Sequence, residues 1–259
     1  MAVFRGTAYS ACLKRNTNIN VIFPDRSNDV DPLYEDEPKV LYLLHGLSGS
    51  EEEWLRFSKI EYYAKKYNFI VIMPAADRSF YCNTKTGIAY FDYVADELPQ
   101  ICRRWLNISS ARENTFIAGE SMGGYGAVKI GLSRPQNYAG IASLSGVLNY
   151  NAFKQLVAES EWTEMDISEL ELLEDGITPL SLALEAAGDP DRPKLIQLCG
   201  TEDFLYADNQ IFRKALEEKG YGHIYLEGPG DHEWPYWDKA VQYAFMFFRG
   251  LDLKTTRIY

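Results

Sequence analysis

Short, almost wholly apolar runs alternate with longer amphipathic stretches along most of this chain, and this alternation constrains the fold more than any other feature. Strands that are apolar at nearly every position, rather than at every second one, are typical of a parallel sheet covered by helices on both faces. The order strand, helix, strand, helix indicates an open sheet of this kind. The sequence therefore predicts an α/β fold with a mostly parallel central sheet.

The expected elements follow from this spacing. Buried strands are predicted at Val40–Leu44, Phe69–Met73, Thr115–Ala118, Gly140–Leu144 and Lys194–Leu198. Helices are predicted at Glu51–Tyr67, Asp92–Leu106, Met122–Ser133, Tyr206–Lys219 and Trp237–Arg249. Near the N-terminus, Gly6–Leu13 and Thr17–Phe23 flank a short polar turn and predict an antiparallel hairpin at the sheet edge.

One stretch breaks the alternation. Residues 147–188 are acidic and helix-prone, and we interpret them as a cap-like insertion over the carboxyl edge of the sheet, where ligands bind in such folds. The chain of 259 residues is otherwise of a length that suits one undivided α/β domain, so we expect residues 1–259 to form a single domain.

Charge and composition exclude several classes of partner. The net charge of −11 disfavours a nucleic-acid backbone or an anionic membrane surface. Eight acids and no Lys or Arg lie between Glu159 and Asp175. There is no signal-peptide pattern, no run of roughly 20 apolar residues that could form a membrane helix, and no CxxC spacing among the four cysteines. We therefore expect a cytoplasmic protein with reduced thiols.

The segment Gly119-Glu-Ser-Met-Gly123 matches the pattern G-x-S-x-G once in the chain. An apolar strand runs into it and a helix rich in Gly and Ala follows. So sharp a strand-to-helix turn strains the serine backbone and exposes its hydroxyl at the end of the sheet. Glycines on both sides are needed because a Cβ would collide with the neighbouring strand and helix. The pattern predicts Ser121 as a nucleophile; the competing interpretation is an ordinary N-cap serine.

A serine hydroxyl needs a base to take its proton, and histidine suits that role near neutral pH. Of the three histidines, His232 lies in the loop after the last expected strand, where the fold's chain order of serine, acid, histidine requires the base. His45 precedes a glycine-containing loop, and we interpret it as a residue with a structural hydrogen-bonding role. His223 begins an expected strand, and we interpret it as a packing or surface residue.

The acid that orients the histidine is expected at the end of the strand between the serine and the histidine. Asp203 lies there, after a strand and a glycine turn, and its carboxylate would hold the imidazole tautomer. Glu202 and Asp208 are the competing carboxylates. Asp231 is too near His232 in the chain to reach its ring easily.

Two backbone amides are candidates for the oxyanion hole. One is the N–H of Met122, directly after the serine, and the other is the N–H of Leu47, in the loop after the Val40–Leu44 strand. Among the aromatic residues near these positions, Trp54, Phe204 and Trp234 are the predicted substrate contacts, although large aromatics are more often packing residues.

With these residues placed, the chain resembles the esterase D-like putative esterase family of the α/β-hydrolase fold. The resemblance covers nearly the whole sequence. Its most specific parts are His45-Gly-Leu-Ser-Gly49 followed by Trp54, Gly119-Glu-Ser-Met-Gly-Gly124, Gly200-Thr-Glu-Asp203, and Asp231-His-Glu-Trp234 with Trp237. Within the family the chain is most similar to intracellular tributyrin esterases. The resemblance implies hydrolysis of short-acyl esters, with the family roles falling on Ser121, Asp203, His232, Leu47 and Met122.

Several activities fit these residues. The first is a serine carboxylesterase acting on neutral short-chain acyl or small aryl esters through an acyl-enzyme. The second is a thioesterase of the S-formylglutathione hydrolase type, for which Arg78 and Lys85 could meet glutathione's carboxylates; the cysteine-bearing oxyanion loop typical of those enzymes is not seen, since Ser48 and Gly49 follow Leu47.

Acyl transfer on the same triad and a catalytically silent binding protein are further alternatives, and the complete triad disfavours the last. We expect a small-molecule ester as the partner, no cofactor and no metal ligand set. The oligomeric state stays open, a homo-oligomer included. We also hypothesise that the acidic residues 159–175 disfavour anionic substrates through charge repulsion.

Overall fold

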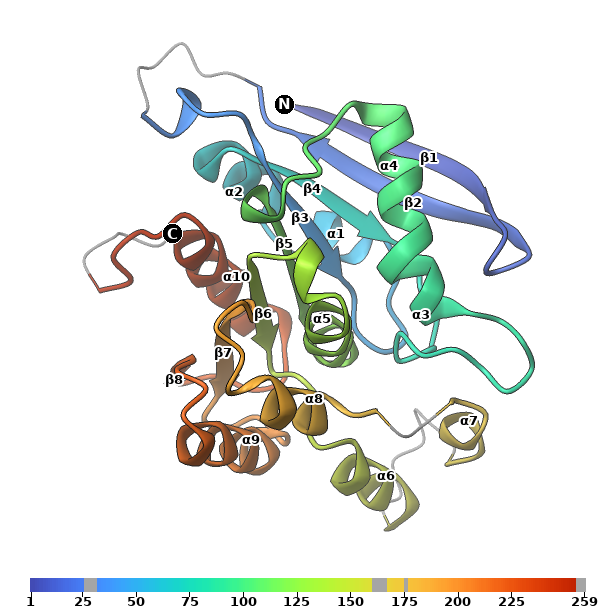
Figure 1. Ribbon diagram of the computed structural model, residues 1–259, viewed down its shortest axis with the longest axis vertical. Helices are drawn as coiled ribbons and strands as arrows, with labels where there is room; N and C mark the ends of the chain where they lie inside the picture. The colour runs from blue at the N-terminus through green and yellow to red at the C-terminus, as the bar shows by residue number, and fades with distance from the viewer. Residues whose placement is uncertain (26–31, 160–166, 175–176, 255–259) are drawn as a thin grey trace.

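The computed structural model describes residues 1–25, 32–159, 167–174 and 177–254. In these residues the strands form one eight-stranded sheet with the order β1-β2-β4-β3-β5-β6-β7-β8 (Figure 1). Strand β2 runs antiparallel to both β1 and β4, and the other pairs are parallel. The strands are β1 Ala2–Ser10, β2 Arg15–Phe23, β3 Lys39–Leu44, β4 Phe69–Pro74, β5 Thr115–Glu120, β6 Gly140–Leu144, β7 Lys194–Gly200 and β8 Ile224–Gly228.

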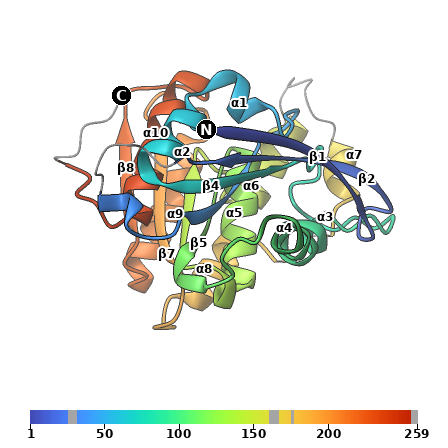
Figure 2. The same cartoon turned by 90° about the horizontal axis from the view of Figure 1, so that it is seen from above.

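Helices cover both faces of the sheet, as the apolar runs predict. Helices α1, α2 and α10 lie on one face, and α4, α5, α8 and α9 lie on the other (Figure 2). The α-helices are α1 Glu53–Phe57, α2 Ile60–Tyr67, α3 Tyr90–Asp92, α4 Leu98–Leu106, α5 Met122–Ser133, α6 Tyr150–Glu159, α7 Ile167–Glu171, α8 Pro179–Ala186, α9 Tyr206–Lys219 and α10 Trp234–Phe248. A π-helical turn, Tyr93–Glu97, joins α3 to α4, and short 3-10 turns lie at Pro32–Tyr34, Arg112–Asn114 and Pro135–Asn137.

The N-terminal hairpin is confirmed, but its first strand ends earlier than predicted. Pairing runs from Ala2 opposite Phe23 to Ser10 opposite Arg15. Beyond Ser10 the backbone turns toward Glu97, whose carboxylate accepts a hydrogen bond from the Ala11 N–H at 2.8 Å. The residues up to Leu13 therefore belong to the turn, because a side chain 86 positions away satisfies the backbone there.

The single helix predicted over Glu51–Tyr67 is wrong; the structure has two helices, α1 and α2, separated at Ser58. The Ser58 backbone is extended, with φ −136° and ψ 172°, and its hydroxyl accepts from the Ile60 N–H at 3.2 Å. The next amide, of Lys59, donates to Asp238 of α10 at 2.8 Å. The break thus depends on a contact with a distant helix. Helix α10 itself begins at Trp234 rather than at the predicted Trp237.

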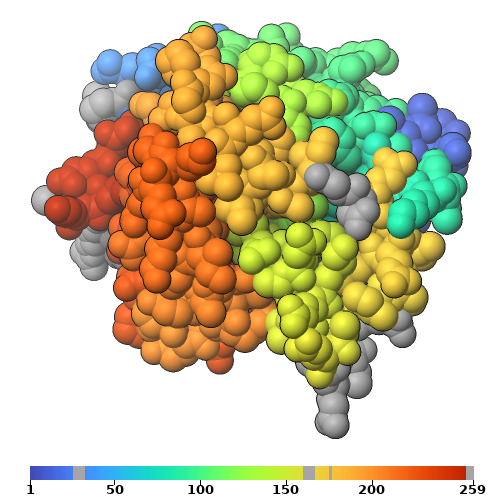
Figure 3. All heavy atoms as spheres, turned by 60° about the horizontal axis from the view of Figure 1, so that its bottom comes forward, coloured from blue at the N-terminus to red at the C-terminus, as the bar shows by residue number. Residues whose placement is uncertain are grey.

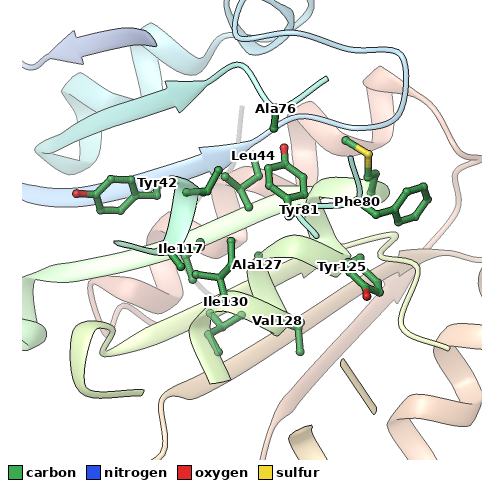
Figure 4. Packing of buried hydrophobic residues seen from close by; sticks show 14 of the residues in the cluster. Tyr42, Leu44, Ala76, Phe80, Tyr81, Ile117, Tyr125, Ala127, Val128 and Ile130 are labelled. Carbon is green, nitrogen blue, oxygen red and sulfur yellow. The ribbon is translucent and has the colours of Figure 1, made fainter. Parts of the chain in front are cut away.

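The core lies on both sides of the sheet, and α5 is central to one of its layers. Figure 4 shows Tyr42, Leu44 and Ile117 of the sheet facing Ala127 and other residues of α5. Every residue of α5 from Met122 to Leu132 is buried, including Lys129, whose ammonium donates to the Cys82 sulfur at 2.9 Å. Burying one large apolar side chain stabilises the fold by about 1.5–3 kcal/mol, and this packing holds the start of α5 firmly in place.

Residues 147–188 contain α6, α7 and α8, although 160–166 and 175–176 lie outside the described residues. Helix α8 packs against α5 and α9, and α7 lies against the loop that follows β4 (Figure 3). Four acids of the predicted acidic stretch, Glu161, Glu164, Asp166 and Asp175, are among the residues that are not described. Within the described ranges, no helix is both long and apolar enough to cross a membrane.

Candidate active site

Ser121 lies between the end of β5 and the start of α5, with φ 53° and ψ −118°. A residue with a Cβ is strained in this conformation. The turn is held by three backbone hydrogen bonds of Ser121. Its N–H donates to the Leu144 carbonyl at 2.9 Å, and its carbonyl accepts from the N–H groups of Tyr125 at 3.1 Å and Val147 at 3.3 Å. Only 9% of the residue is exposed, so its hydroxyl meets a defined environment.

The glycines around Ser121 are required by close backbone contacts. A Cβ on Gly119 would lie 2.4 Å from the backbone of Gly123, and one on Gly123 would lie 2.5 Å from the Leu44 carbonyl oxygen. Both distances are shorter than any real Cβ contact. The spacing G-x-S-x-G therefore allows strand β5 and helix α5 to approach each other and β3 without displacing the serine.

His232 lies in the loop between β8 and α10, and its Nε2 is 2.9 Å from the Ser121 hydroxyl. Its Nδ1 is 3.0 and 2.9 Å from the two carboxylate oxygens of Asp203. Because a carboxylate only accepts hydrogen bonds, the ring proton is on Nδ1 and Nε2 is left to accept from the serine hydroxyl. These contacts bring together three residues that are distant in the sequence and that the sequence analysis selected.

The competing carboxylates have other partners. Glu202 accepts hydrogen bonds from the Gly230 N–H and the Thr201 hydroxyl. Asp231 accepts from the N–H of His232 itself, at 2.7 Å. The Asp203 side chain is fully buried beside the histidine and also accepts from the Leu205 N–H at 2.8 Å. Asp203 is thus the carboxylate positioned to orient the ring.

The loop after β3 carries Leu47, the predicted second oxyanion donor, and Leu47 lines the same pocket as Ser121 and His232. Met122 is the first residue of α5, where a backbone N–H has no intrahelical acceptor. Leu47 thus lines the pocket of Ser121 and Met122 follows Ser121 in the chain, and the role of their amides as oxyanion donors stays a prediction.

Three side chains hold this loop. His45 is buried, and burial lowers its pKa, so the ring is neutral; its Nε2 accepts from the Ala76 N–H at 3.0 Å, and its Nδ1 donates to the Gly46 carbonyl at 2.8 Å. The Tyr81 hydroxyl donates to the His45 carbonyl at 2.9 Å. The Trp54 indole N–H donates to the Leu44 carbonyl at 3.2 Å.

Trp54 is only 1% exposed and is not among the residues that line the pocket. Its position does not support the predicted substrate contact; it supports the loop from behind instead. Trp54 was predicted because it follows the loop closely in the sequence. That proximity serves packing.

The pocket at Ser121 has a volume of about 350 Å³ and receives Trp234 and Trp237 from α10. The Trp237 ring meets the His232 ring edge-on at 4.9 Å between centroids. Phe204 is 48% exposed, and its ring centroid lies 4.5 Å from that of His232, on the rim beside the triad. Trp234 thus lines the pocket together with Trp237, which was not a predicted substrate contact, and Phe204 lies outside the lining.

Sequence reasoning missed three acids that line this pocket: Glu53 of α1, Glu120 of β5 and Glu233 before α10. Glu120 is even part of the serine motif. No sequence pattern indicated that residues 53 and 120 meet, because their proximity depends on how α1 packs at the end of the sheet.

Arg78 links this site to the segment 147–188. Its guanidinium contacts both carboxylate oxygens of Glu169 on α7, at 2.7 and 3.2 Å, and donates to the Ser48 hydroxyl at 2.6 Å. Ser48 follows Leu47 directly. Lys85, in the same loop as Arg78, donates from its ammonium to the Glu171 carbonyl at 2.6 Å.

A strained serine after a central strand, a histidine after the last strand and an aspartate between them, on a mostly parallel sheet, define the α/β-hydrolase fold. Among the described residues, no group of three or more His, Cys, Asp or Glu side chains gathers as a metal site would require.

Residues 10–248 match the model of the family described as putative esterase, and the chain belongs to that family. An acetyl esterase from Caldicellulosiruptor saccharolyticus is 32% identical over 95% of this chain and 97% of the relative. Two solved structures are similar. FphF, a fluorophosphonate-binding serine hydrolase from Staphylococcus aureus, is 32% identical with a TM-score of 0.83, covering 95% of this chain and 98% of that one. The S-formylglutathione hydrolase FrmB from Staphylococcus aureus is 33% identical with a TM-score of 0.77, covering 95% and 96%.

These relationships and the fold identify the chain as a carboxylic-ester hydrolase.

Proposed function

We propose that this protein is a serine esterase that hydrolyses short-chain acyl esters, of the acetyl, butyryl or small aryl type, through an acyl-enzyme on Ser121. The observation that carries the proposal is the continuous hydrogen-bond chain from Ser121 through His232 to Asp203 at the wall of a pocket. The pocket, of about 350 Å³, is at the small end of ligand sites, which favours short substrates. The acetyl esterase relative adds support for a small acyl group.

In the proposed mechanism His232 Nε2 takes the proton of Ser121 as the hydroxyl oxygen attacks the ester carbonyl. Asp203 holds the ring and stabilises the imidazolium. The carbonyl oxygen becomes an anion between the amides of Leu47 and Met122, each worth about 2.7–4 kcal/mol in the transition state. His232 then gives its proton to the departing alcohol. Water repeats the sequence on the acyl-enzyme and frees Ser121, while Trp234 and Phe204 contact the substrate.

The test is hydrolysis of p-nitrophenyl acetate, butyrate and octanoate by the wild type and by Ser121→Ala. We expect kcat/KM to fall as the acyl chain lengthens, and activity to vanish in the variant. Equal activity in the variant would remove Ser121 from the mechanism. Absence of hydrolysis of all three esters by the wild type would contradict the esterase proposal.

A thioesterase of the S-formylglutathione hydrolase type is the second candidate, favoured by the 33% identity to FrmB. The structure weakens one argument for it, because Arg78 and Lys85 already bind α7. Turnover of S-formylglutathione without turnover of the p-nitrophenyl esters would support this candidate. Acyl transfer to an acceptor other than water would instead leave the acyl-enzyme stable in buffer.

The segment 147–188 is our candidate for a cap within a single domain of residues 1–259. The support is that α7 contacts the loop after β4 and, through Arg78, the residue next to Leu47. Its acidic residues are proposed to disfavour anionic substrates.

A further inference from the structure

Two carboxyl groups that the triad does not use line the same pocket as Ser121 and His232. Glu120 is the last residue of β5, directly before the nucleophile, and is only 2% exposed. Glu53 is the first residue of α1. Two acids in one enclosed place beside a nucleophile call for a physical account, because buried carboxylates are costly without partners.

Both carboxyls lie directly against glycines of the loop that carries Leu47. A Cβ on Gly46 would lie 2.4 and 2.5 Å from the two carboxyl oxygens of Glu120. A Cβ on Gly49 would lie 2.1 Å from an oxygen of Glu53. The Gly46 backbone is hydrogen-bonded to the Glu120 carboxyl. The two acids thus contact the loop on either side of Leu47, and the glycines leave the room that they occupy.

The charges around the two acids do not neutralise both of them. Burial raises the pKa of Glu120 well above its usual value, and the charge of Glu53 raises it further, against the hydrogen bond from Gly46. Burial raises the pKa of Glu53 to about 7, opposed by Arg56 on the same helix. Two carboxyls so placed titrate as a pair.

The other titratable groups around the pair belong to the neighbouring loops. The buried His45 ring is neutral, and the Tyr81 phenol keeps its proton, since burial and the charge of Glu120 raise its pKa. The remaining groups are the triad itself and Glu233, which adds a negative charge rather than a positive one.

We propose that Glu53 and Glu120 hold one proton between them while the enzyme turns over, and act as positioning residues for the Leu47 loop. With one proton the pair carries a single charge. A second charge would stand next to the place where the substrate carbonyl oxygen becomes an anion, and would oppose the transition state. This inference rests on the proposed function, because it assumes that Leu47 faces the oxyanion.

The test is the pH dependence of kcat/KM for p-nitrophenyl acetate from about pH 5 to about pH 10. For the wild type we expect kcat/KM to reach a plateau and then to decline about tenfold as the pair loses its remaining proton. Glu53→Gln and Glu120→Gln each leave one carboxyl, which holds no more than one charge. Both variants should therefore keep the plateau at alkaline pH. Glu61→Gln, an exposed acid on α2, is the matched control and should retain the decline.

Carbon-13 NMR of glutamate-labelled protein measures the proton directly and does not depend on activity. We expect one carboxyl to stay protonated through neutral pH in the wild type and in Ser121→Ala, and to lose its proton at a lower pH in Glu53→Gln, because the charge of Glu53 that raises the pKa of Glu120 is gone. If Glu120→Gln does not fold, Glu53→Gln alone decides. A pair fully ionised at neutral pH, or an alkaline decline unchanged in the folded variants, would overturn the inference. Absence of ester hydrolysis with the carboxyl proton present would count against the proposed function instead.

Discussion

At position 121 the backbone has φ 53° and ψ −118°, a conformation that a Cβ makes unfavourable. Strain of this kind amounts to about 1–3 kcal/mol and persists only where the surrounding structure enforces it. Here the enforcement comes from the hydrogen bonds of Ser121 to Leu144 and Tyr125, and from the buried α5. The proposed nucleophile is thus also a residue that destabilises the fold.

This predicts a difference between two inactive variants. Ser121→Ala and Ser121→Gly both lose the hydroxyl, so kcat should fall by about 10⁴- to 10⁶-fold in each. Only glycine relieves the strain, and we expect Ser121→Gly to be more stable than Ser121→Ala by about 1 kcal/mol, after its larger unfolded-state entropy is included. Urea unfolding of the two variants measures this. Greater stability of the alanine variant would show that the turn is not strained.

Glu53 should make stability depend on pH. Its pKa is raised from 4.5 to about 7, so the folded state binds more protons than the unfolded state between these values. Stability from this group is therefore greatest below about pH 4.5 and is lost as pH rises through about 7. We expect Glu53→Gln to raise the melting temperature at about pH 8 more than at about pH 5. An equal shift at both pH values, or the same effect from Glu61→Gln, would contradict this.

At the scale of elements, the site is assembled by loops at the carboxyl ends of β3, β5, β7 and β8, and the β3 loop needs the most support. Tyr81 from the β4 loop, Trp54 from α1 and the neutral His45 all hydrogen-bond to its backbone or to backbone beside it. Backbone amides can stabilise an oxyanion only if they are already aimed at it. We therefore expect the position of this loop to control catalysis without any of these side chains touching the substrate.

Removing the Tyr81 hydroxyl tests this control. Tyr81→Phe leaves the ring in the core but frees the His45 carbonyl, at a net cost of about 1 kcal/mol. We expect kcat for p-nitrophenyl acetate to fall about three- to tenfold while KM changes less than about twofold, because the lost contact acts on the transition state. Tyr42→Phe, a buried tyrosine at the far side of Figure 4, is the control and should leave kcat unchanged. A change confined to KM would show that the Tyr81 hydroxyl contributes to binding of the substrate in its ground state instead.

The elements that were predicted correctly are those with a local signal. The five predicted strands appear because they are apolar throughout, and the sharp turn at Ser121 was predicted because glycines mark the close approach of β5 and α5. The break at Ser58 was missed because Asp238, far along the chain, satisfies the Lys59 amide. Glu53 and Glu120 were missed for the same reason: their meeting depends on tertiary packing alone.

At the scale of the whole molecule, negative charge is concentrated between Glu159 and Asp175, and α7 brings part of it next to the loop after β3. A field of one sign near a pocket changes the local concentration of charged substrates. The charge pattern therefore bears on which esters reach Ser121, as well as on solubility.

We expect a neutral acetate ester to have a kcat/KM about two- to tenfold above that of a matched anionic ester, with the difference shrinking as salt is added. Replacing Glu171 and Glu174 by glutamine should reduce the difference in kcat/KM between the two esters. The same charge change at Glu35 and Glu37, on the exposed loop before β3, should leave this difference unchanged. Equal kcat/KM values for the two esters at low salt would contradict the hypothesis that the acidic residues repel anionic substrates.

The guanidinium of Arg78 joins Ser48, beside the proposed oxyanion donor, to Glu169 of α7. A substitution at any one of these three positions removes a hydrogen bond or an ion pair from the residues that remain, so such changes are tolerated best when they occur together. Across the esterase family the three positions should therefore covary, and lineages that lost the arginine should also have lost the acid. Substitutions in the acidic segment would then be accompanied by substitutions in the loop after β3, more than a hundred residues away in the chain.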